Sequence, residues 1–384
     1  YAANNPGWRD VERLAARLDI RCITRKYPVG AKAGNLMHTW DMLSIPDRAL
    51  VAVFDADHAP TPQFFVETLS HFADPAVGWV QTGQYYRNTD NLIANWADQQ
   101  MLLFYDNLCP YKARSNALFL CGTNFVLRAR ALNEIGGLPM ASPTEDFAAS
   151  LPMHINGWRS VYLSQRLSSG LGPMDMKSYL RQQSRWARGC LMVMRDYWQH
   201  IFLPWKRGLT LNQRFHYFLS GTHYLGGLRD LVFVLTPVIF LLLGVSAIRS
   251  ESPIYLVSFT AYWAIGMMAA ANYMVDRVSI WRVNMMSFGC FPMLVRSFQR
   301  VLVQDHQPFD VTSKQRLVQG NRLSLLPHVG FAALIILSLV IGWGVHSAPR
   351  ADIAVNTFWL VYSLANLIGF VVLGVMSDIR ATDS

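Results

Sequence analysis

The stretch "ALVAVFDADHAP", residues 49–60, decides the fold of this chain. It opens on a continuous apolar run with β-branched residues and ends in two carboxylates and a histidine. An apolar run without polar alternation is typical of a strand buried on both faces in a parallel sheet. We therefore expect a buried strand that presents Asp55, Asp57 and His58 at its carboxyl end.

The segments around this strand alternate between strand and helix patterns. "IRCITR" (20–25) and "VGWVQTG" (77–83) have the composition of strands, and "TPQFFVETLSHFAD" (61–74) has helical spacing. "LFLCGTNFVLRARALNEIGG" (118–137) reads as a strand followed by a helix. Such alternation predicts a doubly wound α/β domain.

The composition indicates a membrane part after the α/β domain. Of the 384 residues, 52% are hydrophobic and 15% are charged, whereas soluble domains carry about 25% charged residues. About 20 apolar residues are needed to cross a bilayer. Four segments are long and apolar enough, which predicts four spans with both ends of the chain on one side: 212–245, 254–274, 325–345 and 356–376. Arginines mixed with apolar residues in 282–302 suit a helix lying in the membrane interface.

The net charge of +9 fits cytoplasmic loops under the positive-inside rule and also a phosphate-bearing ligand. No basic run is interleaved with aromatic residues along one face, so we expect no nucleic-acid partner. The five cysteines are scattered without a CxxC pair, which indicates reduced thiols on the cytosolic side and no structural metal. The chain starts without Met or a signal-peptide pattern, and we expect it to be a fragment.

Two short motifs suit a diphosphate ligand. In "DADH" (55–58), carboxylates one residue apart at a strand end point to the same side and suit a hard divalent cation; a solvated turn is the alternative. In "AKAGN" (31–35), small residues let the backbone approach a ligand, and Lys32 supplies a point charge for phosphate. An ordinary lysine at a helix start is the alternative there.

Two further motifs suit acid–base chemistry and sugar binding. In "TED" (144–146), Asp146 is a candidate general base that Glu145 would orient or make more basic. The alternative is Thr144 as a helix N-cap with acids in the first turn. In "QQSRW" (182–186), Gln182 and Arg185 share one helix face, and Trp186 offers a flat platform for a sugar ring; an interfacial anchor is the alternative. "FDVTSK" (309–314) is a short polar segment that could equally be a solvated loop.

Taken in order, these motifs resemble those of the processive, membrane-embedded family 2 glycosyltransferases of the bacterial cellulose synthase group. The matching segments, spread over about residues 10–376, are "KAGN", "DADH", "QTG", "CGT" (121–123), "TED", "GW" (157–158), "QQSRW" and "FDVTSK". The resemblance implies an α/β nucleotide-sugar-binding domain of the GT-A type followed by an α-helical membrane domain. The expected division is a glycosyltransferase domain (1–180), interfacial helices (181–210), two spans (211–281), an interfacial helix with a gating loop (282–324) and two spans (325–384).

The resemblance also implies a role for each motif residue. Asp57 and His58 would hold Mg²⁺ or Mn²⁺. The nucleotide sugar would be bound by Lys32, Asp55, Gln182 and Arg185. Asp146 would be the catalytic base, assisted by Glu145. The acceptor sugar would be contacted by Trp186, Cys121 and Thr144. The gating loop would include Phe309, Val311, Thr312 and Lys314.

The implied activity is polymerisation of glucose from UDP-glucose into a β-glucan, with export across the inner membrane from a cytoplasmic catalytic domain. Implied partners are the UDP-sugar, the nascent polysaccharide, the lipid bilayer and a periplasmic accessory subunit. Cellulose synthases usually read QTPH where this chain has "QTGQYY" (81–86), which leaves β-1,3- and mixed-linkage glucans open beside cellulose. An inactive export channel and a non-processive lipid glycosyltransferase are the rival classes. The family's earlier aspartate is absent, so we expect the chain to be truncated at its start.

Overall fold

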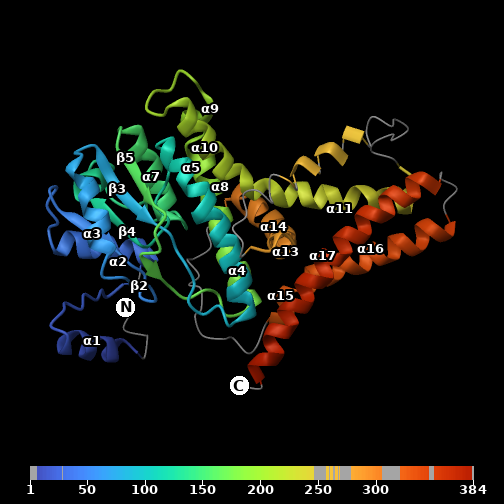
Figure 1. Ribbon diagram of the computed structural model, residues 1–384, viewed down its shortest axis with the longest axis horizontal. Coiled ribbons are helices and arrows are strands. Elements are labelled where there is room, and N and C mark those ends of the chain that lie inside the picture. The colour runs from blue at the N-terminus through green and yellow to red at the C-terminus, as the bar shows by residue number, and fades with distance from the viewer. Residues whose placement is uncertain are drawn as a thin grey trace.

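The computed structural model describes residues 7–27, 29–245, 278–304, 321–345 and 350–382, together with a few helical residues between 257 and 268. Most of the expected span 254–274 and the whole of the expected gating loop, 309–314, lie outside the described residues. A mixed sheet with its helices stands at one end of the molecule, and the long apolar helices extend from it at the other (Figure 1).

The main sheet has four strands in the order β1 (Leu50–Val53), β4 (Phe125–Arg128), β3 (Val77–Thr82), β5 (Arg159–Leu163). Strand β4 is antiparallel to both β1 and β3, whereas β3 and β5 are parallel. The prediction of a parallel sheet is therefore wrong for β4. The cause is local: Asn124 donates to Val53 O (2.8 Å) and accepts from Thr82 N (3.0 Å), so β4 begins at the carboxyl ends of its neighbours and runs back between them.

Two further strand predictions need correction. The strand that we expected to be fully buried, β1, is an edge strand of the sheet, and only its Val53 is buried while Leu50 remains 37% exposed. The buried central strand is β3, in which all six residues are buried. Residues 20–25 form no strand; they lie mostly exposed, and Arg25 uses its guanidinium on the carbonyl of Ala31 instead (2.6 Å).

A small second sheet lies beside the end of β1. Strand β2 (Ala59–Pro60) pairs antiparallel with β6 (Ser168–Ser169). This pairing brings the loop after β6 against the "DADH" turn.

Helices cover the sheet and provide its core. They are α1 (Trp8–Arg17), α2 (Ala31–Met42), α3 (Phe64–Leu69), η1 (Ser70–Ala73), α4 (Leu92–Leu102), the π-helix η2 (Leu103–Leu108), α5 (Cys109–Arg114), α6 (Ala129–Asn133) and α7 (Glu145–Ile155). One face of the sheet packs Trp79 and Leu127 against Met153 of α7. The other face packs Val80 and Val126 against Phe64 of α3. Burial on both faces explains why β3 and β4 are apolar without alternation.

The second half of the chain is helical. Its elements are α8 (Met176–Asp196), α9 (Trp198–Phe202), α10 (Leu211–Thr222), η3 (His223–Leu225), α11 (Gly226–Leu243), α13 (Ile280–Gly289), α14 (Phe291–Leu302), α15 (Asn321–Ser324), α16 (Leu326–Val345) and α17 (Arg350–Thr382). Three helical stretches of the described chain are long and apolar enough to cross a membrane: Leu211–Leu243, Leu326–Gly344 and Asp352–Ser377. The expected single helix 282–302 is two helices, because Pro292 lies in the first turn of α14 and cannot continue α13.

Helix α8 joins the two halves of the molecule. Its first half contributes Met176 and Tyr179 to a core shared with Met285 of α13 and Phe370 of α17. Its second half contributes Cys190 and Val193 to a core shared with α7 and α10. The "QQSRW" motif lies between these two anchor points. The expected architecture, an α/β domain followed by apolar membrane-length helices, is thus confirmed.

Candidate active site

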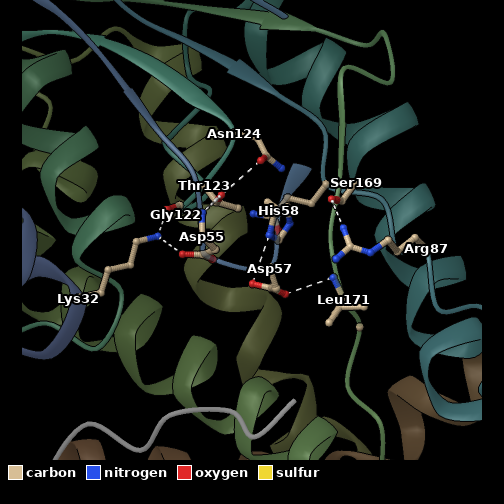
Figure 2. Close-up of polar contacts among 12 residues, drawn as sticks. Lys32, Asp55, Asp57, His58, Arg87, Gly122, Thr123, Asn124, Ser169 and Leu171 are labelled. Atoms are coloured by element: carbon tan, nitrogen blue, oxygen red, sulfur yellow. Dashed lines mark hydrogen bonds and ion pairs between the residues drawn. The ribbon is translucent and has the colours of Figure 1, made fainter. Parts of the chain in front are cut away.

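Asp55, Asp57 and His58 form a compact cluster in the turn after β1. The backbone N–H of His58 donates to Asp55 O (2.9 Å), which closes the turn. One ligand atom from each of the three side chains lies within 4.8 Å of the others, and His58 Nδ1 is 3.6 Å from Asp57 Oδ1 (Figure 2). The prediction that these side chains converge is realised in the geometry.

The His58 ring is the strongest sign that the cluster binds a metal ion. Its side chain is only 4% exposed, and within the described part of the chain neither ring nitrogen has a hydrogen-bond partner. Buried polar atoms are nearly always satisfied, so an orphaned imidazole calls for an explanation. Carboxylate oxygens with a neutral imidazole are a donor set that suits Mn²⁺ and, through the oxygens, Mg²⁺. The residues present therefore fit a divalent cation.

The loop after β6 presses against this cluster and was missed by sequence reasoning. The backbone N–H of Leu171 donates to Asp57 Oδ2 (3.2 Å; Figure 2). A Cβ built on Gly170 would lie 2.3 Å from His58 Nε2, so any larger residue there would displace the ring. The signal in the sequence is "SSGLG" (168–172), two glycines just after a short strand.

Lys32 links the cluster to the "CGT" segment. Its ammonium donates to Asp55 Oδ1 (2.5 Å) and to the carbonyl of Gly122, while Asp55 N donates to Thr123 Oγ1 (2.8 Å; Figure 2). The lysine reaches this position because Gly30 (φ 74°), the N-cap residue of α2, and Ala31 (φ 45°), its first residue, both adopt left-handed backbone. Such a turn needs a residue without side-chain crowding, which explains the glycine of the loop.

Asp146 stands on the other side of Gly122. Gly122 has φ 85°, and a Cβ on it would lie 3.0 Å from Asp146 Oδ2. Burial, followed by the neighbouring Glu145 carboxylate, raises the pKa of Asp146 to about 7, although the charges of Lys32 and Arg185 oppose the rise. A buried carboxyl with a pKa near neutrality is suited to general-base catalysis.

The positions of the "TED" residues are those of the structural alternative, with Glu145 and Asp146 in the first turn of α7, but the capping hydrogen bond is missing. Thr144 is the N-cap residue of α7, but its side chain makes no capping hydrogen bond. Its hydroxyl is buried without a hydrogen-bond partner among the described residues. Glu145 is also buried. Thr144 and Glu145 are therefore buried residues and not solvent-exposed residues of a helix start.

The "QQSRW" motif lies on α8. Tyr86 links this motif to Asp57 of the cluster after β1. Burial raises the pKa of the Tyr86 phenol, while its hydrogen bond with the Gln182 side chain lowers it; Asp57 and Arg185 also act on it electrostatically. Tyr86 itself is held by a parallel bridge to Gly170. Sequence reasoning quoted "QTGQYY" but did not single out this tyrosine. Arg185 and Trp186 are half-buried.

Cys121 is positioned by one glutamine of the central strand β3, Gln81, and by one that follows it, Gln84. Its N–H donates to Gln81 Oε1 (2.8 Å), and its carbonyl accepts from Gln84 Nε2 (2.6 Å). The "QTGQ" residues thus fix the backbone of the "CGT" segment. Lys32, Asp55 and Asp146 therefore meet around residues 121–123, and Gln182, Arg185 and Trp186 lie on α8. The expected gating loop lies outside the described residues.

Comparison with known proteins gives one family. A family model described as "Glycosyl transferase family group 2" matches residues 50–275. Cellulose synthase 2 of Novacetimonas hansenii is 30% identical over 364 residues, covering 90% of this chain and 22% of that protein. The UDP-forming cellulose synthase catalytic subunit of Pseudomonas fluorescens is 26% identical over 370 residues, covering 92% of this chain and 49% of that protein. The chain thus spans between about a fifth and a half of the length of these curated relatives.

Among solved structures, a mannosyltransferase of Pyrobaculum calidifontis in complex with GDP-Man and Mn²⁺ superposes with a TM-score of 0.49. The sequence identity is 13%, over 79% of this chain and 76% of that one. The family assignment therefore rests on the sequence comparisons.

Proposed function

The chain belongs to glycosyl transferase family group 2, and on that premise we propose that it is the catalytic part of a processive, inverting β-glucan synthase embedded in the inner membrane. Glucose from UDP-glucose is the proposed substrate, and cellulose is the proposed product. One observation carries the proposal: Asp55, Asp57 and His58 (the metal-type cluster) with Lys32 lie on one side of Gly122, and the half-buried Asp146 lies on the other. Lys32, which would bind the donor, and Asp146, which would activate the acceptor, are thus separated only by the backbone at Gly122.

The donor-binding part of the site neutralises the charge of the diphosphate leaving group. Asp57 and His58, with Asp55 beside them, would hold Mg²⁺ or Mn²⁺, which when bound supplies Lewis-acid stabilisation of the diphosphate charge. Lys32 adds a point charge at the diphosphate, and Arg185 adds a planar fork of donors that suits phosphate oxygens. Gln182, on the same face of α8 as Arg185, donates to the same group.

The acceptor-binding part of the site supplies a general base and an aromatic ring for the acceptor sugar. Asp146 takes the proton of the acceptor hydroxyl as that oxygen attacks the anomeric carbon. The bond from this carbon to the diphosphate oxygen breaks in the same displacement, so a donor with an α-linkage yields a β-linkage. Trp186 stacks on the acceptor sugar, and Cys121 and Thr144 contact its edges. Because Trp186 and Arg185 are neighbours on α8, one helical turn touches both substrates.

The helical half suits export of the product. The described chain has three membrane-length helices, and α8 packs against both α7, which carries Asp146, and α17 of the membrane part. In this proposal residues 1–180 are the cytoplasmic catalytic domain, residues 181–210 lie at the interface, and the polymer leaves beside the membrane helices. A periplasmic accessory subunit would receive it.

A β-1,3-glucan is the second candidate product. Gln84 stands in the segment where this chain departs from the cellulose synthase pattern, and its amide contacts the Cys121 carbonyl (2.6 Å) on the acceptor side of the site. A residue in that position can alter which acceptor hydroxyl faces Asp146. The presence of six motif residues in the sequence disfavours an inactive export channel: Asp55, Asp57, Asp146, Gln182, Arg185 and Trp186.

The test is incorporation of radiolabelled UDP-glucose by membranes carrying the full-length protein, with Mg²⁺ or Mn²⁺ and with EDTA. We expect metal-dependent formation of a polymer that β-1,4-glucanase digests. Digestion by β-1,3-glucanase alone would move the assignment to the second candidate. Failure to form polymer from any UDP-sugar would overturn the synthase proposal.

A further inference from the structure

Gly189 follows Trp186 by three residues on α8 and is fully covered. We propose that Gly189 is a positioning residue: its missing side chain lets α8 approach the first turn of α7 and thereby sets the distance between Trp186 and Asp146. This inference rests on the proposed function for its catalytic consequence. The contact on which it depends can be tested without any activity.

The contact is unusually close. A Cβ built on Gly189 would lie 2.1 Å from Thr144 Oγ1, 2.5 Å from Thr144 Cγ2 and 2.7 Å from Thr144 Cβ. All three distances are below 3.0 Å, where something must shift. Rotating the threonine about χ1 moves its oxygen and methyl group but leaves Cβ in place, so a rotamer change does not relieve the overlap. The backbone of Thr144 or of α8 would have to move.

Movement at Thr144 is transmitted directly to the catalytic groups. Thr144 is the N-cap residue of α7, and Glu145 and Asp146 are the first two residues of the helix. Just beyond the contact the two helices are locked by a buried core in which Cys190 and Val193 of α8 meet Phe147 and Leu151 of α7. Because this core is closely packed, the helices cannot separate locally without loss of packing.

Helix propensity alone predicts that Gly189→Ala stabilises the protein, whereas the contact with Thr144 predicts that it destabilises it. The two explanations can therefore be told apart. Alanine is a better helix former than glycine, so Gly189→Ala would stabilise an unobstructed α8. A glycine retained in mid-helix against this preference is explained by the Thr144 contact. Gly330 on α16 is a matched control, because it is helical and exposed and a Cβ there meets nothing within 4 Å.

The first measurement is steady-state kinetics of the full-length protein in membranes. We expect Gly189→Ala to lower kcat for polymer formation about 100-fold, the size of effect that a displacement of about 1 Å can produce. KM for UDP-glucose should change by a smaller factor than kcat, because Lys32 and the cluster of Asp55, Asp57 and His58 lie outside α8 and only Gln182 and Arg185 of the proposed donor site move with it. Gly330→Ala should behave as wild type. A Gly189→Ala protein with wild-type kcat would overturn the inference.

The second measurement is the thermal unfolding midpoint of the detergent-purified protein for Gly189→Ala, Thr144→Gly and the double variant. Gly189→Ala should lower the midpoint in the wild-type background, yet raise it or leave it unchanged when Thr144→Gly has removed the obstructing atoms. If Gly189→Ala does not fold, recovery of folded protein in the double variant is the same result. An equal change of the unfolding midpoint by Gly189→Ala in the wild-type and Thr144→Gly proteins would show that the Thr144 contact does not limit residue 189. Because this cycle needs no substrate, it separates failure of the inference from failure of the proposed function.

Discussion

At the scale of single residues, Asp146 is the carboxyl whose surroundings best suit a general base. It is surrounded by a like charge from Glu145 and by the cations Lys32 and Arg185. Burial dominates these influences and brings its pKa to about 7. The carboxyl is therefore basic enough to accept a proton and still largely ionised slightly above neutral pH.

Replacing Asp146 by Asn should abolish elongation while leaving the donor site intact. The amide is nearly isosteric but cannot accept the hydroxyl proton, so kcat should fall by a factor of about 10² to 10⁴. UDP binding, measured by calorimetry in the presence of Mg²⁺, should stay within about twofold. Asp90→Asn, at an exposed position, is the control for loss of a carboxylate. Loss of UDP binding in Asp146→Asn would show that Asp146 contacts the donor instead.

The pH dependence of the rate should report the same carboxyl. The base works in its ionised form, so kcat/KM should rise with pH and reach half its maximum near pH 7. The sign for stability is opposite. Between pH 4 and 7 the folded protein holds a proton on Asp146 that the unfolded chain has lost, so this group stabilises the fold at low pH and its contribution is lost as pH rises through 7. A rate that falls across pH 6–8 would rule out Asp146 as the base.

At the scale of elements, the site is built by loops at the ends of β1, β3 and α2 and by two helix segments. The sequence predicted the "DADH" turn, the lysine loop and the "QQSRW" helix, because each depends on local patterns of charge and small residues. It could not predict that β4 runs antiparallel or that β1 is an edge strand, since apolar runs do not reveal strand direction. It also missed Gly170 and Tyr86, whose importance comes from contacts between segments more than 80 residues apart in the chain.

The lysine loop gives a prediction of its own. Lys32→Met removes the ammonium between Asp55 and the Gly122 carbonyl, and we expect KM for UDP-glucose to rise at least tenfold. Because the Lys32 charge lowers the pKa of Asp146, the midpoint of the pH–rate profile should also move upward. Lys26→Met is the control, since Lys26 is exposed in the segment that precedes α2. A change in kcat with an unchanged KM would place Lys32 outside the donor site.

At the scale of the whole molecule, α8 connects the α/β domain with the membrane-length helices. Its first half packs on α13 and α17, and its second half on α7 and α10. Between them on α8 lie Gln182, Arg185 and Trp186, and Figure 1 shows this helix between the sheet domain and the apolar helices. In the proposed function, one helix therefore fixes the substrate-binding residues relative to both halves of the protein.

Coupled synthesis and export is the central claim, and reconstitution tests it most directly. The full-length protein is placed in liposomes, radiolabelled UDP-glucose and Mg²⁺ are added outside, and glucanase is added outside with or without detergent. For molecules whose catalytic domain faces outward, we expect labelled glucan that resists glucanase until detergent opens the vesicles, and no labelled polymer from Asp146→Asn. Polymer that glucanase removes without detergent would contradict export through this chain, and the absence of polymer would contradict the synthase itself.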